Sequence, residues 1–254
     1  MICNKIFGVY PLKPKAVFLD LDGTLVEFCI DYVGARSEAL GLLERYGLPE
    51  SLGLTVRDSI FYMDREVKRY MLKRGEPRLY GEIHSRLEAI LDRYELRAAE
   101  VTRLLPNVRE TLRELRGMGL RLILFTADGD KAMNAIVDRT GIRDFFDLLI
   151  SRGSSMDVKP HPRHVSEAVA LSGSKPEESI LVGDSVADII SGKIINAITV
   201  GVLTGLGSRE QLVEAEADYV IESVADLPPI IKRVQVEGPN RFKITQPKSS
   251  HTSS

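Results

Sequence analysis

Short apolar runs alternate with helical patterns over most of the chain. The first run begins at Ala16 and breaks at Gly23, as a buried parallel strand that ends in a turn would. Strands that alternate with helices imply a parallel sheet with helices on both faces and right-handed crossovers. We therefore predict an α/β fold. Further predicted strands cover residues 120–126, 146–151, 179–184, 197–202 and 218–221, and predicted helices cover 108–117, 131–140, 163–172, 186–194 and 208–215.

Residues 26–104 depart from this alternation, because they show helical spacing of apolar residues but no strong buried-strand run. Glycine and proline interrupt the pattern at 47–49 and at 75–77. The predicted helices of this stretch cover residues 31–46, 55–74 and 78–95.

The domain prediction follows from these patterns, with Pro106 marking the return to the alternating part of the chain. The last residues are polar, rich in serine and free of large apolar side chains, so we expect a mobile tail there. We predict an α/β core domain of residues 1–25 and 105–236, an inserted α-helical cap domain of 26–104, and a polar tail of 237–254.

Charge and composition exclude several classes of partner. The 34 basic and 36 acidic residues leave a net charge of -2, so no overall field favours nucleic acid or an acidic membrane surface. We expect a small-molecule partner, and a monomer or homodimer. Cys3 and Cys29 lack metal-ligand spacing and fit a reducing compartment. Since no stretch resembles a signal-peptide core or an apolar span of about 20 residues, we expect a cytoplasmic protein.

Two carboxylates stand at the predicted end of the first strand. Asp20 and Asp22 lie where open parallel sheets place their ligand sites, and Gly23 permits a sharp turn that lets both converge. Two unpaired carboxylates beside apolar neighbours are costly unless a cation or a proton offsets their charge. Taken alone, the same residues also fit an ordinary turn, because Asp and Gly are common turn formers.

A second carboxylate pair ends the predicted strand 179–184. Asp184 is the last residue of this predicted strand, and Asp188 comes four residues later at the start of the next helix. A helix cap formed by Asp184 or Ser185 would explain part of this pattern. Carboxylates at the ends of two strands make a purely structural explanation much weaker.

Thr126 and Lys159 complete the candidate site. Thr126 closes the strand 120–126, where its hydroxyl and the free amides of the turn that begins at Ala127 could donate to a phosphate oxygen. Lys159 supplies a cation that would neutralise a carboxylate or a phosphate. Each residue alone has a structural alternative, a strand end for the threonine and a solvated charge for the lysine.

The set as a whole resembles the haloacid dehalogenase superfamily, in its phosphatase branch. The family pattern Asp-x-Asp-Gly-Thr matches residues 20–24, and Gly-Asp-Ser-x-x-Asp is matched at Gly183, Asp184, Ser185 and Asp188. Thr126 and Lys159 stand at the second and third motifs, in the family's order. The resemblance covers about residues 15–205 and implies a Rossmann-like core, an inserted helical cap, and Mg²⁺ as cofactor.

The resemblance also implies a role for each matched residue. Asp20 would be the nucleophile that carries an aspartyl-phosphate, and Asp22 the general acid and base. Lys159 would bind the substrate phosphate, together with Thr126 and Ala127. The metal set would be Asp20, Asp22 through its backbone carbonyl, Asp184, and Asp188 through water or as an orienting group.

The helical insert falls where the family carries a cap that selects the leaving group. One predicted cap helix is basic, which would attract an anionic leaving group, although a solvated face with ion pairs explains the same charges. Lys159, His161 and Arg163 stand in a sequence that resembles phosphoglycolate phosphatases and their relatives. A small phosphorylated acid or sugar is therefore the expected substrate. The basic residues are Arg57, Arg65, Lys68, Arg69, Lys73 and Arg74.

Other functions share part of the pattern. A sugar-phosphate mutase would carry the same four motifs but would hold a bisphosphate and keep water from the aspartyl-phosphate. A dehalogenase would have little use for Asp22 with Asp184, and a phosphonate hydrolase would need a cap lysine that nothing here marks. A non-catalytic binding module would not need every catalytic residue type. We predict a phosphoric monoester hydrolase, and the sugar-phosphate mutase stays the alternative, because no residue of the cap distinguishes the two.

Overall fold

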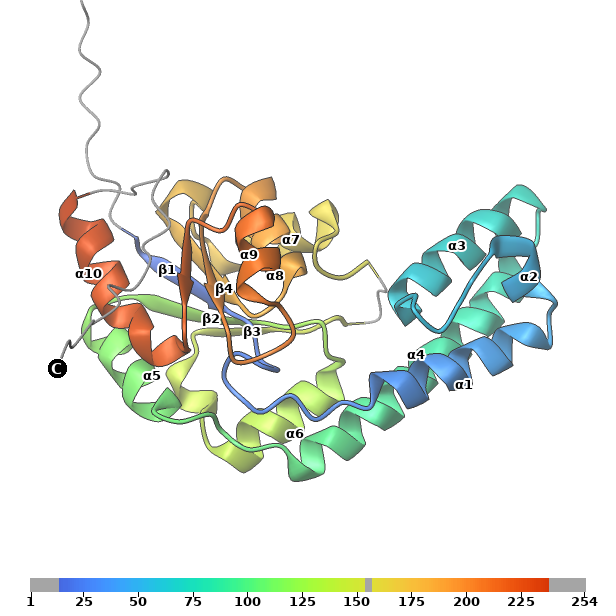
Figure 1. The fold of residues 1–254 in the computed structure, drawn as a ribbon, viewed down its shortest axis with the longest axis horizontal. Helices are drawn as coiled ribbons and strands as arrows, with labels where there is room; N and C mark the ends of the chain where they lie inside the picture. The colour runs from blue at the N-terminus through green and yellow to red at the C-terminus, as the bar shows by residue number, and fades with distance from the viewer. Residues whose placement is uncertain (1–13, 154–156, 238–254) are drawn as a thin grey trace, which may run out of the picture.

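The computed structural model describes residues 14–153 and 157–237, and within these ranges six strands form one sheet. Every pair of neighbouring strands is parallel, in the order β3-β2-β1-β4-β5-β6 (Figure 1). All six predicted strands are present and the α/β prediction is confirmed. The strands are β1 (Ala16–Leu19), β2 (Arg121–Phe125), β3 (Leu148–Ile150), β4 (Ser179–Gly183), β5 (Ile198–Val202) and β6 (Tyr219–Ile221).

Helices cover both faces of this sheet. Val17 and Leu19 of β1 point to one face and pack with α5, α6 and α10, whereas Phe18 points to the other face and packs with α7. Each buried side chain of this size contributes about 1.5–3 kcal/mol by leaving water. The core helices are α5 (Val108–Gly117), α6 (Asp130–Thr140), α7 (Pro162–Ser172), α8 (Val186–Ile194), α9 (Arg209–Glu214) and α10 (Leu227–Glu237), with short 3-10 helices η1 (Arg143–Phe145), η2 (Pro176–Glu178) and η3 (Val224–Asp226).

Between β1 and β2 the chain forms helices only. Figure 1 shows α1 to α4 projecting to one side of the sheet, with α4 reaching back toward α6. These helices bury a hydrophobic cluster of their own, centred on Leu43, Met63 and Leu87, which supports the predicted cap. They are α1 (Tyr32–Glu44), α2 (Leu48–Leu52), α3 (Ile60–Lys73) and α4 (Pro77–Val101).

The segments that enter and leave these helices run side by side. Val26 and Leu104 form an antiparallel bridge, and Glu27 N donates to Arg103 O at 2.8 Å. Thr102 Oγ1 also donates to Glu27 O at 2.6 Å. The inserted helices therefore begin and end at one place on the core, close to the predicted limits of 26 and 104. The domain limits themselves stay a prediction, and residues 238–254 of the predicted tail lie outside the described residues.

Local details differ from the expected helices. The break expected at 47–49 contains helix α2, because Pro49 stands in the first turn, where proline is tolerated. The helix expected at 55–74 begins only at Ile60, since Ser59 Oγ accepts from Tyr62 N at 3.1 Å and caps it. Helix α4 runs beyond residue 95 to Val101, and helix α10, with prolines in its first turn, was not expected.

Among the described residues, we find no helix whose length and hydropathy would let it cross a membrane.

The parallel arrangement of the strands determines where a functional site can lie. It brings the carboxyl ends of β1, β2 and β4 to the same edge of the sheet, next to the start of α1 and the long helix α4.

Candidate active site

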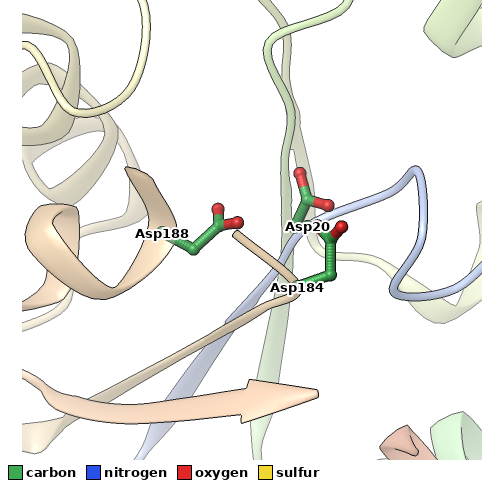
Figure 2. Close-up of side chains that lie close together, drawn as sticks. All are labelled: Asp20, Asp184 and Asp188. Atoms are coloured by element: carbon green, nitrogen blue, oxygen red, sulfur yellow. The ribbon is translucent and has the colours of Figure 1, made fainter. Parts of the chain in front are cut away.

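Three carboxylates meet at the carboxyl edge of the sheet. Asp20 follows β1, Asp184 follows β4, and Asp188 lies in the first turn of α8; one oxygen of each lies within 4.8 Å of the others. Figure 2 shows Asp20 and Asp184 side by side, with Asp188 reaching toward them from its helix. All three are buried, with exposures of 8%, 3% and 1%. The sequence prediction placed these residues together, and the structure does so.

Lys159 stands between two of these carboxylates. Its Nζ donates to Asp20 Oδ1 and to Asp188 Oδ1, both at 2.6 Å, and to Phe125 O at 2.8 Å. Burial alone would lower the pKa of Lys159, but Asp188 and Asp20 hold it above its ordinary value. The lysine is therefore a buried, charged partner of Asp20, and the solvated-charge alternative is wrong.

Asp188 serves as a helix cap and as part of the cluster at once. Its Oδ2 accepts from Ser185 N at 3.1 Å and from Ser185 Oγ at 2.6 Å, while Ser185 Oγ accepts from Asp188 N. This reciprocal capping box fixes the carboxylate and leaves Oδ1 for Lys159. Asp188 is therefore part of the helix cap and lies in the carboxylate cluster, while its role toward a metal stays a prediction.

A glycine cradle surrounds Asp184. Its Oδ2 accepts from Leu206 N at 2.6 Å, and a Cβ added to Gly205 would lie only 1.9 Å from that oxygen. A Cβ on Gly23 would lie 2.6 Å from it, and Gly23 also has a positive φ of 75°. The backbone thus approaches the carboxylate closely on two sides, and sequence reasoning did not anticipate the part played by residues 205–206.

The cluster carries more negative than positive charge. Burial raises the pKa of Asp20 to about 6, with Lys159 lowering and Asp188 raising it, and burial with Asp20 and Asp188 raises that of Asp184 to about 8. Three carboxylates face one ammonium group, so a cation would offset the remaining charge. Carboxylate oxygens are the ligands that hard cations such as Mg²⁺ prefer, and these residues fit such an ion.

Asp22 is placed apart from this cluster. Its carboxyl is not among the three groups whose oxygens converge, and it lies against Asp128 instead. Burial, and next Asp128, raise the pKa of Asp22 well above its ordinary range. Burial and Glu95 raise the pKa of Asp128 to about 7. Asp22 is therefore suited to hold a proton, whereas only its main chain is left for the predicted metal contact.

The turn after β2 carries the predicted phosphate-binding residues. Thr126 is buried, its amide donates to Ile150 O at 2.9 Å, and its Oγ1 accepts from Asp128 N at 3.1 Å. Within residues 14–153 and 157–237 its hydroxyl proton has no acceptor, so it can donate to a ligand. Thr126 and Ala127 both line a cavity beside the carboxylates.

This cavity has a volume of about 580 Å³ and lies between the sheet edge and the inserted helices. Asp20 and Lys159 line one side, while Arg36, Arg65 and Lys68 line the other. Arg65 Nε lies 3.7 Å from Glu66 Oε1, whereas Arg36 lies over the ring of Tyr32 and Lys68 over that of Tyr80. Part of the basic helix thus faces the site, and Arg36 is an addition that the sequence did not indicate.

The other predicted neighbours of Lys159 divide between two environments. His161 lines the cavity, whereas Arg163 lies outside it and pairs with Glu167 at 2.9 Å. Of the remaining basic residues, Arg69 pairs with Glu66 and Arg74 with Glu76, as a solvated helix face would. Arg57, Lys73 and these arginines do not line the cavity.

Comparison with known proteins defines the class. Residues 14–196 match the family described as haloacid dehalogenase-like hydrolase. A phosphoglycolate phosphatase of Caulobacter vibrioides (strain ATCC 19089 / CIP 103742 / CB 15) is 31% identical, over 87% of this chain and 92% of its own. Pyrophosphatase PpaX of Bacillus mycoides (strain KBAB4) is 26% identical, over 88% and 99%. The structure of a predicted phosphoglycolate phosphatase from Haemophilus somnus 129PT has a TM-score of 0.59 at 21% identity, covering 88% of this chain and 99% of its own.

The fold, the site and these relatives define a hydrolase. The chain belongs to the haloacid dehalogenase-like hydrolases, and within them it is a phosphatase.

Proposed function

We propose that this phosphatase hydrolyses a small-molecule phosphate monoester through an aspartyl-phosphate on Asp20, with Mg²⁺ as cofactor. The observation that carries the proposal is the position of Asp20 in the cavity lining, where its carboxylate accepts from Lys159 at 2.6 Å. A carboxylate attacks phosphorus poorly when both are negative. A buried ammonium group beside the nucleophile lowers that repulsion.

The metal would be held by Asp20, Asp184 and the main-chain carbonyl of Asp22, with Asp188 contacting it or orienting its ligands. When bound, Mg²⁺ supplies positive charge that draws the phosphoryl oxygens toward the nucleophile and stabilises the charge of the transition state. The proposal is supported by the surplus of carboxylates over cations in the cluster.

The remaining steps follow from the placement of the side chains. Asp20 attacks phosphorus, while the Thr126 hydroxyl, the Ala127 amide and Lys159 donate to the phosphoryl oxygens. Asp22 gives its proton to the leaving oxygen and then accepts one from the water that cleaves the aspartyl-phosphate. The raised pKa of Asp22 supports this role, because a proton-holding carboxyl is needed at neutral pH.

The cavity supports a substrate with a second anionic group. Arg36, Arg65 and Lys68 face Asp20 across the cavity, so a leaving group with a carboxylate or a second phosphate would be attracted there. We propose phosphoglycolate or a sugar phosphate, that is, a small phosphorylated metabolite. The names of the relatives, phosphoglycolate phosphatase and pyrophosphatase, support an anionic leaving group. A cytoplasmic location stays a prediction.

The experiment is phosphate release from a panel of small phosphate esters, with magnesium and with a chelator, for the wild type and Asp20→Asn. We expect magnesium-dependent release from at least one ester and none from the folded variant. An active Asp20→Asn protein would contradict the mechanism. Release that requires a bisphosphate activator, with the phosphoryl group returned to a sugar, would instead support the mutase alternative.

A further inference from the structure

A buried arginine lies beside the turn that carries Thr126 and Ala127. Arg152 lies two residues after the end of β3 and is only 3% exposed. Its Nη1 donates to Ala127 O at 3.0 Å and to Glu95 Oε1 at 2.5 Å, and its Nη2 donates to Asp92 Oδ1 at 3.1 Å. One guanidinium group therefore joins β3, helix α4 and the turn after β2.

Glu95 binds the same turn from the other side. Its Oε2 accepts from Gly129 N at 2.9 Å, and the residue is only 4% exposed. Arg152 thus holds the carbonyl just before Asp128, and Glu95 holds the amide just after it. We call Arg152 and Glu95, with the main chain of 127–129 between them, the loop clamp.

Packing around Gly129 shows how closely the backbone approaches the loop clamp. A Cβ added there would lie 2.9 Å from Asp92 Oδ1, 3.0 Å from Arg152 Nη2 and 3.3 Å from Glu95 Oε2. The backbone φ of Gly129 is -70°, which any residue adopts. The glycine is therefore needed for space beside the clamp, not for its conformation.

A purely stabilising ion pair is the alternative explanation. Buried ion pairs add little net stability over apolar residues of the same volume, because both charges must lose their water. Here both charged groups contact the main chain of a single turn, on either side of Asp128. Asp128 and Asp22 line the same cavity, and after burial the Asp128 carboxyl is the largest cause that raises the pKa of Asp22. The loop clamp therefore fixes the main chain of residues 127–129, which carries the proposed phosphate-binding amide of Ala127.

We propose that Arg152 and Glu95 are positioning residues, which hold Asp128 against the acid-base carboxyl of Asp22 and hold the phosphate-binding turn in place. The inference rests on the proposed roles of Asp22 and Ala127. Both Asp92 and Glu95 belong to α4, and Phe61 of α3 lies 5.9 Å from the guanidinium carbon of Arg152. The inserted helices thereby contribute to the order of the catalytic turn as well as to the cavity wall.

The test compares leaving groups, because a ratio of two substrates does not depend on the fraction of folded enzyme. An alkyl phosphate needs a proton on its leaving oxygen, whereas 4-nitrophenyl phosphate has a good leaving group and needs the acid much less. A displaced Asp22 should therefore lower kcat/KM for the alkyl ester more than for the aryl ester. The readout is the alkyl-to-aryl ratio of kcat/KM, measured with magnesium.

The first variant is Arg152→Met with Glu95→Gln, which removes both charges and leaves no buried ion unpaired. We expect the ratio to fall about 10- to 100-fold, the usual effect of losing a partner that orients an active-site group. Arg152→Lys keeps the charge but loses the planar guanidinium group. Its alkyl-to-aryl ratio should lie between those of the double variant and the wild type. Gly129→Ala crowds the clamp with every charged group present and should lower the ratio as well.

The matched control is Arg139→Met. Arg139 also joins the core to α4, since it donates to Ala99 O at 2.9 Å and to Thr102 O, but it does not touch the turn. Its ratio should equal that of the wild type. A wild-type ratio in the double variant, or in Gly129→Ala if the double variant does not fold, would overturn the inference. If Asp22→Asn itself left the ratio unchanged, the proposed acid role would fail instead.

Discussion

The ammonium group of Lys159 donates a 2.6 Å hydrogen bond to the Oδ1 atom of Asp20, the carboxylate proposed to attack phosphorus. The same nitrogen contacts Asp188 at 2.6 Å, so the nucleophile and the helix-capping carboxylate share one cation. Asp188 is in turn fixed by Ser185 at 2.6 Å, and the other oxygen of Asp20 accepts from Thr24 Oγ1 at 3.2 Å. The lysine is therefore held from one side and can position the nucleophile on the other.

Lys159→Met should remove most of the activity. The variant loses the charge that lowers repulsion between Asp20 and the phosphoryl group, and removal of one such donor typically lowers kcat by about 10²- to 10³-fold. Lys15→Met is the control, because Lys15 forms an exposed ion pair with Glu178. Steady-state kinetics check the prediction, and a Lys159→Met enzyme with wild-type kcat would contradict the role of the lysine.

Asp22→Asn should separate the two halves of the proton chemistry. Asparagine cannot protonate a leaving group, so turnover of alkyl phosphates should fall by about 10²- to 10⁴-fold. With 4-nitrophenyl phosphate the first step needs no proton, and a burst of 4-nitrophenol should precede a slow steady state, because water attack still lacks its base. Stopped-flow absorbance measures the burst. Equal losses for both esters, with no burst, would argue against the acid-base assignment.

Gly205→Ala should weaken magnesium activation. The new methyl group would stand 1.9 Å from Asp184 Oδ2 in the present geometry, so the carboxylate or the loop must move. We expect the magnesium concentration for half-maximal activity to rise about 10-fold or more, as when a metal ligand is displaced. Gly81→Ala is the matched control: no atom lies within 4 Å of its added Cβ, and it should stabilise helix α4 by about 0.5–1 kcal/mol. If Gly205→Ala were activated by magnesium as the wild type is, the close packing of Gly205 against Asp184 would not matter for metal binding.

The metal-free protein should lose stability as pH rises. Burial raises the pKa of Asp20 to about 6, of Asp128 to about 7 and of Asp184 to about 8, from an ordinary value of 3.8. The native state therefore binds these protons more tightly than the unfolded state. Their stabilising effect is complete below about pH 4 and is lost as pH rises through about 6 to 8.

The corresponding measurement is the Tm in chelator from about pH 5 to about pH 9, repeated with excess magnesium. We expect a fall of Tm with pH in chelator and a smaller fall with magnesium, because the cation replaces the protons. Asp184→Asn should flatten the chelator curve. A metal-free Tm that rises over this interval would show that the carboxylates are not held in their protonated forms.

The cations on the inserted helices should select for charge in the leaving group. Arg36→Met with Lys68→Met should raise KM for a phosphate ester that also bears a carboxylate, by about 10-fold for each lost ionic contact of about 1.4 kcal/mol. KM for an uncharged alkyl phosphate should change little. Arg57→Met, an exposed residue of the same region that does not line the cavity, is the control. Equal shifts for both esters would place the anionic site elsewhere.

The sheet could be predicted because its central strands are buried on both faces and so appear as apolar runs; in β1 and β4 every residue is buried. Helix α10 was hidden by two prolines, which are breakers inside a helix but acceptable in its first turn. Helix α2 is too short to show a periodicity. Whether these two segments form helices depends on tertiary packing, which the local sequence pattern does not show.

The acidic residues of the site could be predicted from their spacing at strand ends, and the structure brings Asp20, Asp184, Asp188 and Lys159 together. The loop clamp could not be predicted from the sequence. Arg152 resembles any loop arginine in the sequence, and its burial depends on Glu95, 57 residues away along the chain. Only the fold creates that contact.

The pairing of Val26 with Leu104 determines which parts of the insert can change in length. Because the inserted helices leave and rejoin the core at adjacent positions, residues can be added to or removed from α1, α2 and α3 without shifting the register of the sheet. The last part of α4 has no such freedom, since Asp92 and Glu95 are tied to Arg152. Changes of substrate preference can therefore be confined to the distal helices, while the final turns of the insert must keep their contacts with the core.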